Sequence, residues 1–127
     1  MVESMVMLVE DNEDDEYLAL RVLTKHGFGS VVVARDGGEA LDLLLGAGAG
    51  PLPRFVLIDL KLHKLGGIDV IRALRGSERT RELPVIVISS SRDERDMEIC
   101  YGLGVVACLS KPLRSDQFLA AAEEIPA

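Results

Sequence analysis

The chain has 127 residues, of which 48% are hydrophobic and 28% are charged, and its formal net charge is −7. This length suits one domain with a real core, and the composition excludes a disordered chain. The negative charge argues against a general nucleic-acid or membrane surface. No apolar run approaches the ~20 residues that cross a bilayer, and the first run is too short for a signal peptide. We therefore expect one soluble, cytoplasmic domain that spans residues 1–127.

The chain carries two cysteines, Cys100 and Cys108, both in apolar stretches. Their spacing is not that of metal ligands. Because disulfides are rare in the cytoplasm, we expect both side chains to be buried free thiols.

Short apolar runs alternate along the chain with helical patterns. The runs are rich in Val, Ile and Leu and lack polar alternation, which is typical of strands covered on both faces of a parallel sheet. Candidate strands lie at residues 5–9, 31–33, 55–58, 85–88 and 107–109. A helical pattern follows each strand, the last of them at about residues 115–124. Five such units predict an α/β fold with a right-handed, doubly wound parallel sheet.

Capping residues indicate where some of the helices begin and end. Asn12 is a favourable cap for a helix that continues to about Lys25, and Gly27 follows as its stop. Ser91 and Glu94 have the spacing of a capping box, which predicts that a later helix starts there.

Polar residues stand where the predicted central strands end. Glu10 and Asp11 follow the first strand and Asp59 follows the third. Ser89 ends the fourth strand, and Lys111 follows the fifth. In parallel sheets, functional residues gather beyond the carboxyl ends of the strands. The sequence therefore predicts one site that brings together three carboxylates, a hydroxyl and an amine.

The three carboxylates indicate a site for a hard cation. Neighbouring strands lie about 5 Å apart, so Asp11 and Asp59 are expected side by side, with Glu10 next to them. At such a spacing carboxylates resist full ionisation, and a bound divalent cation removes the repulsion. Oxygen ligands suit Mg²⁺ or Mn²⁺, and no histidine or cysteine ends these strands to favour zinc.

The acidic residues that follow the first strand receive a simpler interpretation. Asp14, Asp15 and Glu16 suit the positive end of a helix dipole and are expected to face water. This acidic stretch also argues against a mononucleotide-binding loop, which would need glycines here. A phosphatase with an aspartyl nucleophile is disfavoured as well, because Lys61 stands two residues beyond Asp59, where a second acid is wanted.

Six segments of the sequence together resemble the receiver domains of two-component response regulators. They are Leu8-Val9-Glu10-Asp11-Asn12, Asp36-Gly37-Gly38-Glu39-Ala40-Leu41, Leu57-Ile58-Asp59-Leu60, Gly66-Gly67, Pro84-Val85-Ile86-Val87-Ile88-Ser89 and Lys111-Pro112. The resemblance covers nearly the whole chain. It implies a flavodoxin-like (βα)5 fold with strand order 2-1-3-4-5, and one receiver domain without an output domain.

A narrower resemblance points to the single-domain receivers associated with bacterial phytochrome kinases. It rests on Glu10-Asp11-Asn12 with Asp15 following, on Tyr101-Gly102-Leu103-Gly104, and on Asp116-Gln117-Phe118 after Lys111-Pro112. This group is commonly dimeric, so we expect a homodimer through the face of the fourth helix, fifth strand and fifth helix. Ile99, Tyr101 and Phe118 give that face apolar character, although Phe118 fits a core position equally well.

The family resemblance implies roles for the predicted site residues. Asp59 would be the phosphoacceptor, which attacks a phosphohistidine of a partner to form an acyl phosphate. Ser89 would hydrogen-bond one phosphoryl oxygen, and Lys111 would pair with another. The implied ligands of Mg²⁺ (or Mn²⁺) are Glu10, Asp11, Asp59 and the backbone carbonyl of Lys61. Such a protein assists its own phosphorylation and dephosphorylation but is not a turnover enzyme.

The resemblance also implies partners. They are a sensor histidine kinase or a histidine phosphotransfer protein, of the phytochrome type in the narrower group, and a downstream protein. Output would come through binding, phosphorelay transfer or a role as a phosphate sink. The alternative is a pseudo-receiver that binds partners without phosphorylation, against which the intact Asp11, Asp59, Ser89 and Lys111 argue.

The sequence departs from the family pattern at several positions. Cys108, three residues before Lys111, stands where the family usually has a switching Tyr or Phe. His63 replaces a proline, and Gly66 replaces an aspartate, in the loop after Asp59. We interpret His63 as a solvated loop residue and expect the loop to be looser than usual. The resemblance also predicts a cis bond between Lys111 and Pro112.

Overall fold

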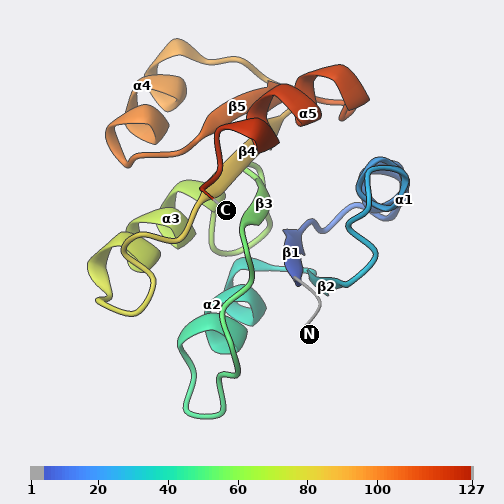
Figure 1. Ribbon diagram of the computed structural model, residues 1–127. Helices are drawn as coiled ribbons and strands as arrows, with labels where there is room; N and C mark the ends of the chain where they lie inside the picture. Colours follow the sequence, from blue (N-terminus) through green and yellow to red (C-terminus); the bar gives the residue numbers. More distant parts are fainter. Residues whose placement is uncertain (1–4, 127) are drawn as a thin grey trace.

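The computed structural model describes residues 5–126 as one five-stranded parallel sheet with five helices (Figure 1). The strands are β1 (Val6–Val9), β2 (Val31–Ala34), β3 (Val56–Asp59), β4 (Val85–Ser89) and β5 (Ala107–Ser110). The helices are α1 (Glu13–Lys25), α2 (Gly37–Leu45), α3 (Gly67–Gly76), α4 (Glu94–Gly102) and α5 (Ser115–Glu123). The strand order is β2-β1-β3-β4-β5, which confirms the predicted doubly wound α/β fold.

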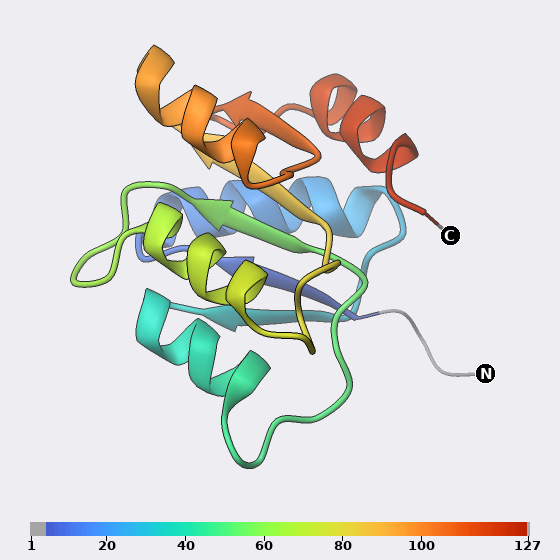
Figure 2. The ribbon, with the colours of Figure 1, turned by 90° about the vertical axis from the view of Figure 1, so that its left-hand side faces the viewer.

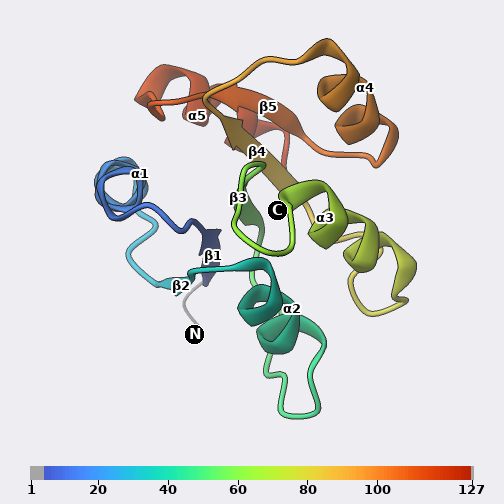
Figure 3. The same ribbon diagram turned by 180° about the vertical axis from the view of Figure 1, so that it is seen from behind.

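The helices cover both faces of the sheet. Helices α1 and α5 lie on one face, and α2, α3 and α4 lie on the other (Figures 2 and 3). Each face has its own hydrophobic cluster, with Phe55 and Phe118 buried beneath α1 and α5. Ile71 and Cys100 are buried on the opposite face. Within residues 5–126, none of the helices combines the length and apolarity that a membrane crossing needs.

The apolar runs without alternation become the strands in the middle of the sheet. Every residue of β1, β3 and β4 is buried, because each of these strands has a neighbour on both sides and helices on both faces. The parallel register aligns Asp59 with Ile88, and Ser89 with Ser110. The polar residues at the carboxyl ends of the strands therefore lie at one edge of the sheet.

The predicted limits of α1 are confirmed. Asn12 caps the helix, since its side chain accepts a hydrogen bond of 2.9 Å from the Asp15 N–H. Gly27 follows the helix with a φ of +89°, a conformation that a side chain would disfavour.

The predicted capping box of Ser91 and Glu94 is wrong. The side chain of Asp93 caps α4 instead, and it accepts hydrogen bonds from the N–H groups of Arg95 and Asp96. The Ser91 N–H, which Glu94 would bond in a capping box, instead donates to the Ser89 hydroxyl at 3.2 Å, and the same hydroxyl donates to the Ser91 carbonyl at 2.7 Å. The helix therefore begins at Glu94 rather than just after Ser91.

Other local expectations are confirmed. The bond between Lys111 and Pro112 is cis. Cys100 and Cys108 are both buried free thiols. Burial, together with the neighbouring Cys108, raises the pKa of Cys100 to about 12, so this thiol stays protonated at neutral pH.

Candidate functional site

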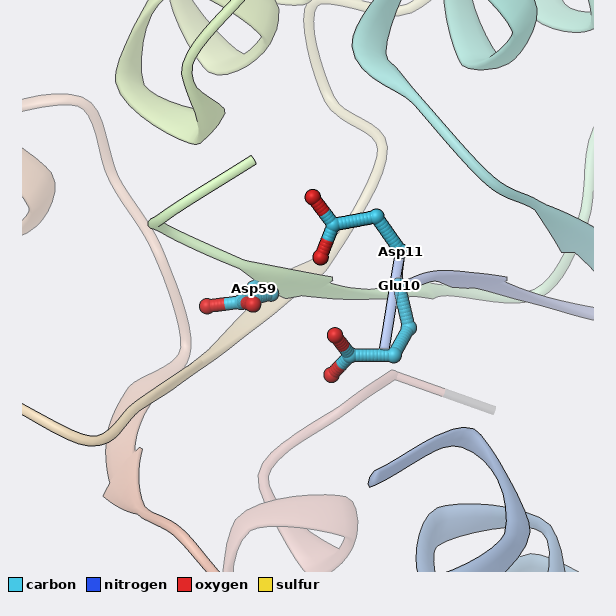
Figure 4. A group of neighbouring side chains, drawn as sticks. All are labelled: Glu10, Asp11 and Asp59. Carbon is cyan, nitrogen blue, oxygen red and sulfur yellow. The ribbon is translucent and has the colours of Figure 1, made fainter. Parts of the chain in front are cut away.

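Three carboxylates gather at the carboxyl edge of the sheet, as the sequence predicts. Glu10 and Asp11 follow β1 directly and lie beside Asp59 at the end of β3 (Figure 4). Each offers an oxygen atom, and these atoms all lie within 4.8 Å of one another. Glu10 and Asp59 are buried and Asp11 is half-buried. The β1–β3 pairing enforces this arrangement, because it fixes the two strand ends side by side.

The surroundings of Glu10 disfavour the ionised form of its side chain. Its side chain has no exposed surface, and burial together with repulsion from Asp59 raises its pKa from 4.5 to about 7. The Asn12 N–H donates to its Oε2 at 3.2 Å, and Lys111 Nζ lies 2.9 Å from its Oε1. These two contacts only partly offset the cost of burying the charge.

Lys111 reaches the site from the loop after β5. Its ammonium donates to Asp59 Oδ2 at 2.9 Å and to Asp15 Oδ2 at 2.8 Å, in addition to its contact with Glu10. Burial alone would lower the pKa of Lys111, but the three carboxylates outweigh it and raise the pKa. The predicted meeting of Lys111 and Asp59 is thus confirmed in the structure.

Asp15 is a residue of the site that sequence reasoning missed. The interpretation of Asp15 as a solvent-facing dipole partner is wrong, because its carboxylate pairs with Lys111 and is only 31% exposed. The available signal was its place in the first turn of the helix that begins beside the site. The reach of Lys111 across to α1 depends on loop geometry that the sequence does not display.

The loop after β3 packs closely on Asp59. The Lys61 N–H donates to Asp59 Oδ1 at 3.0 Å, which holds the carboxylate in place. Gly67 begins α3 directly against this strand, where a Cβ atom would lie 2.6 Å from the Asp59 carbonyl oxygen. Only glycine permits this approach. The metal-binding role of the Lys61 carbonyl stays a prediction.

His63 is a solvated loop residue, as the sequence interpretation expected, and it also contacts Asp11. Its backbone N–H donates to Asp11 Oδ2 at 3.0 Å, and its ring Nδ1 contacts the same oxygen. Partial burial would raise the pKa of Asp11, but these contacts outweigh it and lower the pKa. The His63 side chain is nevertheless 88% exposed, so it covers Asp11 from the solvent side.

Ser89 lies buried at the end of β4, in the strand next to β3. Its hydroxyl hydrogen-bonds only the Ser91 backbone among the described contacts, so it can turn toward a group bound at Asp59 without breaking a side-chain pair. The Ser90–Asp93 loop that it anchors leads directly into α4.

The outer edge of β5 carries two contacts that the sequence did not predict. The hydroxyl of Tyr101, from α4, accepts a hydrogen bond of 3.3 Å from the Cys108 N–H. Arg92 donates to the Cys108 carbonyl at 3.4 Å and to Ser110 Oγ at 3.2 Å. Tyr101 of α4 therefore contacts β5 at Cys108, the position where the family usually has an aromatic residue.

The donor set suits a hard divalent cation. Glu10, Asp11 and Asp59 contribute only oxygen atoms. Carboxylate oxygens with room for water are what Mg²⁺ and Mn²⁺ require. The cluster can therefore hold such an ion beside Asp59.

Comparisons with known proteins agree with this geometry. A family model described as the response regulator receiver domain matches residues 6–123. The chain is 40% identical over 124 residues to the probable methanogenesis regulatory protein FilR2 of Methanothrix harundinacea (strain 6Ac), covering 95% of this chain and 80% of that protein. It is 33% identical to the transcriptional regulatory protein CpxR of Escherichia coli (strain K12), of whose length it spans 46%.

Solved structures give the same result. The bacteriophytochrome response regulator AtBRR superposes with a TM-score of 0.87 at 41% identity, over 98% of this chain and 94% of that one. The Mn²⁺-bound form of response regulator Rcp1 superposes with a TM-score of 0.81 at 27% identity, over 98% of this chain and 100% of that one. The chain therefore belongs to the response regulator receiver domains of two-component signalling.

Proposed function

We propose that this receiver domain accepts a phosphoryl group on Asp59 from a phosphohistidine. The donor is a sensor histidine kinase or a histidine phosphotransfer protein. One observation carries the proposal: the Lys111 ammonium lies 2.9 Å from Asp59 Oδ2, at the sheet edge where Glu10 and Asp11 add two further carboxylates.

In the proposed reaction, a carboxylate oxygen of Asp59 attacks the phosphorus atom. The P–N bond to the imidazole breaks, its electron pair returns to the nitrogen, and an acyl phosphate forms on Asp59. Lys111 pairs with one phosphoryl oxygen, and the Ser89 hydroxyl donates to another. The Lys61 N–H keeps the second oxygen of Asp59 oriented.

The proposed metal is Mg²⁺ or Mn²⁺. The residues that would hold it are Glu10, Asp11, Asp59 and the backbone carbonyl of Lys61. When bound, the ion neutralises charge on the transferring phosphoryl group. The Mn²⁺-bound state of the similar protein Rcp1 supports this assignment. The domain assists its own phosphorylation and dephosphorylation and does not act as a turnover enzyme.

The proposed consequence is a change of a protein-binding surface. Phosphorylation replaces the single negative charge of the Asp59 carboxylate with a group that carries roughly −1.5 to −2, in a pocket whose only described ammonium is that of Lys111. Ser89 then turns inward, and the Ser90–Asp93 loop carries that shift to α4. The likeness to AtBRR, a bacteriophytochrome response regulator, favours a phytochrome-type kinase as the donor.

A labelling experiment separates this proposal from a pseudo-receiver. The protein is incubated with phosphoramidate, and the intact mass is measured with and without Mg²⁺. We expect one added phosphoryl group in the wild type with Mg²⁺, and none in Asp59→Asn. Asp42→Asn, which removes an exposed carboxylate from α2, is the matched control and should label normally. An unlabelled wild type would contradict the proposal and favour the pseudo-receiver, whereas equal labelling of Asp59→Asn would contradict the assignment of Asp59 as the acceptor.

A further inference from the structure

Asp15 differs from the other two carboxylates that contact Lys111. Glu10 and Asp59 belong to the group of three that can hold a metal ion, whereas Asp15 lies outside that group. It stands on α1, and its backbone N–H is fixed by the side chain of Asn12. Its carboxylate therefore offers Lys111 a partner that a metal ion does not use.

A metal ion held by Glu10, Asp11 and Asp59 would share two of these carboxylates with the Lys111 ammonium. The ammonium lies 2.9 Å from an oxygen atom of Glu10 and 2.9 Å from one of Asp59. A divalent cation at these carboxylates repels the ammonium, whose side chain is only 12% exposed. A buried ammonium without a carboxylate partner is costly, so Lys111 would resist giving up Glu10 and Asp59.

We propose that Asp15 is a positioning residue, which keeps the Lys111 ammonium beside Asp59 while leaving Glu10 and Asp59 to the metal ion. The proposal rests on the metal site of the proposed function. Asp15 acts through Lys111, and without its carboxylate the ammonium pairs only with metal-binding groups. Removing that carboxylate therefore weakens metal binding, although Asp15 contacts no metal ion.

A neighbouring residue supplies the matched control. Asp14 belongs to the same first turn of α1 and carries the same charge, but it is exposed and makes no described contact with Lys111. A general loss of negative charge would affect metal binding equally in Asp14→Asn and Asp15→Asn. Only the positioning role distinguishes the two variants.

The test is calorimetric titration of Mg²⁺ into the unphosphorylated protein at fixed ionic strength. We expect Asp15→Asn to raise the Kd for Mg²⁺ by roughly three- to tenfold, which corresponds to one ion pair of about a kcal/mol. Asp14→Asn should change it by no more than about twofold, in line with a screened surface charge. Circular dichroism checks that each variant is folded.

A double-mutant cycle isolates the part played by Lys111. Lys111→Met removes the competing ammonium, so in that background Asp15→Asn should affect the Kd no more than Asp14→Asn does. An equal loss in the two single variants, or a loss that persists with Lys111→Met, would overturn the positioning role alone. If the wild type binds no Mg²⁺ at millimolar concentration, the metal site of the proposed function fails as well.

Discussion

The carboxyl end of β1 and β3 and the outer edge of β5 hold their polar groups in opposite ways. At the first, buried charges crowd together, with three carboxylates within 4.8 Å and a lysine against them. At the second, the contacts are hydrogen bonds of 3.3 Å and 3.4 Å near the surface, from Tyr101 and Arg92 to Cys108. The first region therefore depends on the balance of buried charges, whereas the second depends on single hydrogen bonds between α4, its preceding loop and β5.

The two regions also differ in how far they follow the family pattern. The carboxylates, Ser89 and Lys111 follow the family pattern. The β5 position that usually carries a switching aromatic residue is Cys108, and Tyr101 supplies a hydroxyl to it from α4. The residues that the proposed chemistry needs are therefore all present, whereas the outer edge of β5 departs from the family pattern at Cys108.

The largest effect is expected at the carboxylates of Glu10, Asp11 and Asp59, where a bound cation would offset their repulsion. Mg²⁺ should raise the melting temperature of the wild type, and at 100 times its Kd it adds about 2.7 kcal/mol to the free energy of unfolding. Asp59→Asn relieves repulsion, so it should fold with unchanged or slightly higher stability and lose most of this response to Mg²⁺. Thermal unfolding with and without millimolar Mg²⁺ measures both effects. Loss of folding in Asp59→Asn would instead indicate a structural aspartate.

The second effect concerns Glu10 and pH. Its pKa is raised from 4.5 to about 7 in the folded protein, so between these values the folded state binds more protons than the unfolded state. Its ionisation therefore lowers stability as the pH rises from about 4.5 to 7. Glu10→Gln removes that charge and should stabilise the metal-free protein by about 1–3 kcal/mol at pH 8, and by almost nothing near pH 5.

Urea unfolding at the two pH values checks this prediction. Glu13→Gln, which removes the same charge from an exposed position in the first turn of α1, is the control for the loss of one negative charge. Glu10→Gln that is less stable than the wild type at pH 8 would mean that the Lys111 contact outweighs the burial of the charge.

The sequence predicted those features that depend on strand order and on short-range pattern. Apolar runs located the five strands, and the parallel pairing then placed Glu10, Asp11 and Asp59 together without knowledge of any loop. The predicted capping box of Ser91 and Glu94 failed, because Asp93 caps α4 and the Ser91 N–H donates to the Ser89 hydroxyl, a contact that a spacing rule does not reveal.

Contacts made by long side chains and loops could not be predicted. Lys111 reaches Asp15 across 96 residues of sequence, and His63 reaches Asp11 across 52. Both depend on the path of a loop, which local propensity does not specify. The position of Phe118 was ambiguous for a related reason, since helical spacing alone did not fix which face of α5 points inward. The structure buries it completely.

A smaller effect is expected at the outer edge of β5. Tyr101→Phe removes the acceptor for the Cys108 N–H and should lower the free energy of unfolding by about 0.5–1.5 kcal/mol. Tyr17→Phe is the control, because Tyr17 is 61% exposed and its hydroxyl makes no described hydrogen bond. Chemical unfolding of both variants gives the comparison. Equal stability of Tyr101→Phe and Tyr17→Phe would show that water replaces the Tyr101 hydroxyl without loss.

The weakest expected effect is self-association through the face formed by α4, β5 and α5. Phe118 is buried and cannot contribute, which corrects part of the basis for this prediction. Tyr101 is still 53% exposed, and Cys108 and Ala120 line a hollow between β5 and α5 beside it. A partner copy would cover this apolar surface, so we expect a weak dimer at micromolar concentration, strengthened by a beryllofluoride mimic of the phosphoryl group.

Sedimentation velocity of variants that carry a new lysine tests whether the face of α4, β5 and α5 forms the dimer contact. Ala120→Lys places an ammonium in the hollow and should shift the protein to monomer, because a charge buried in an apolar contact is costly. Leu43→Lys is the matched control, since Leu43 is 42% exposed on α2, which packs beside β2 at the other end of the sheet. A wild type that stays monomeric with and without beryllofluoride would remove the prediction. A dimer disrupted equally by both lysines would place the contact elsewhere.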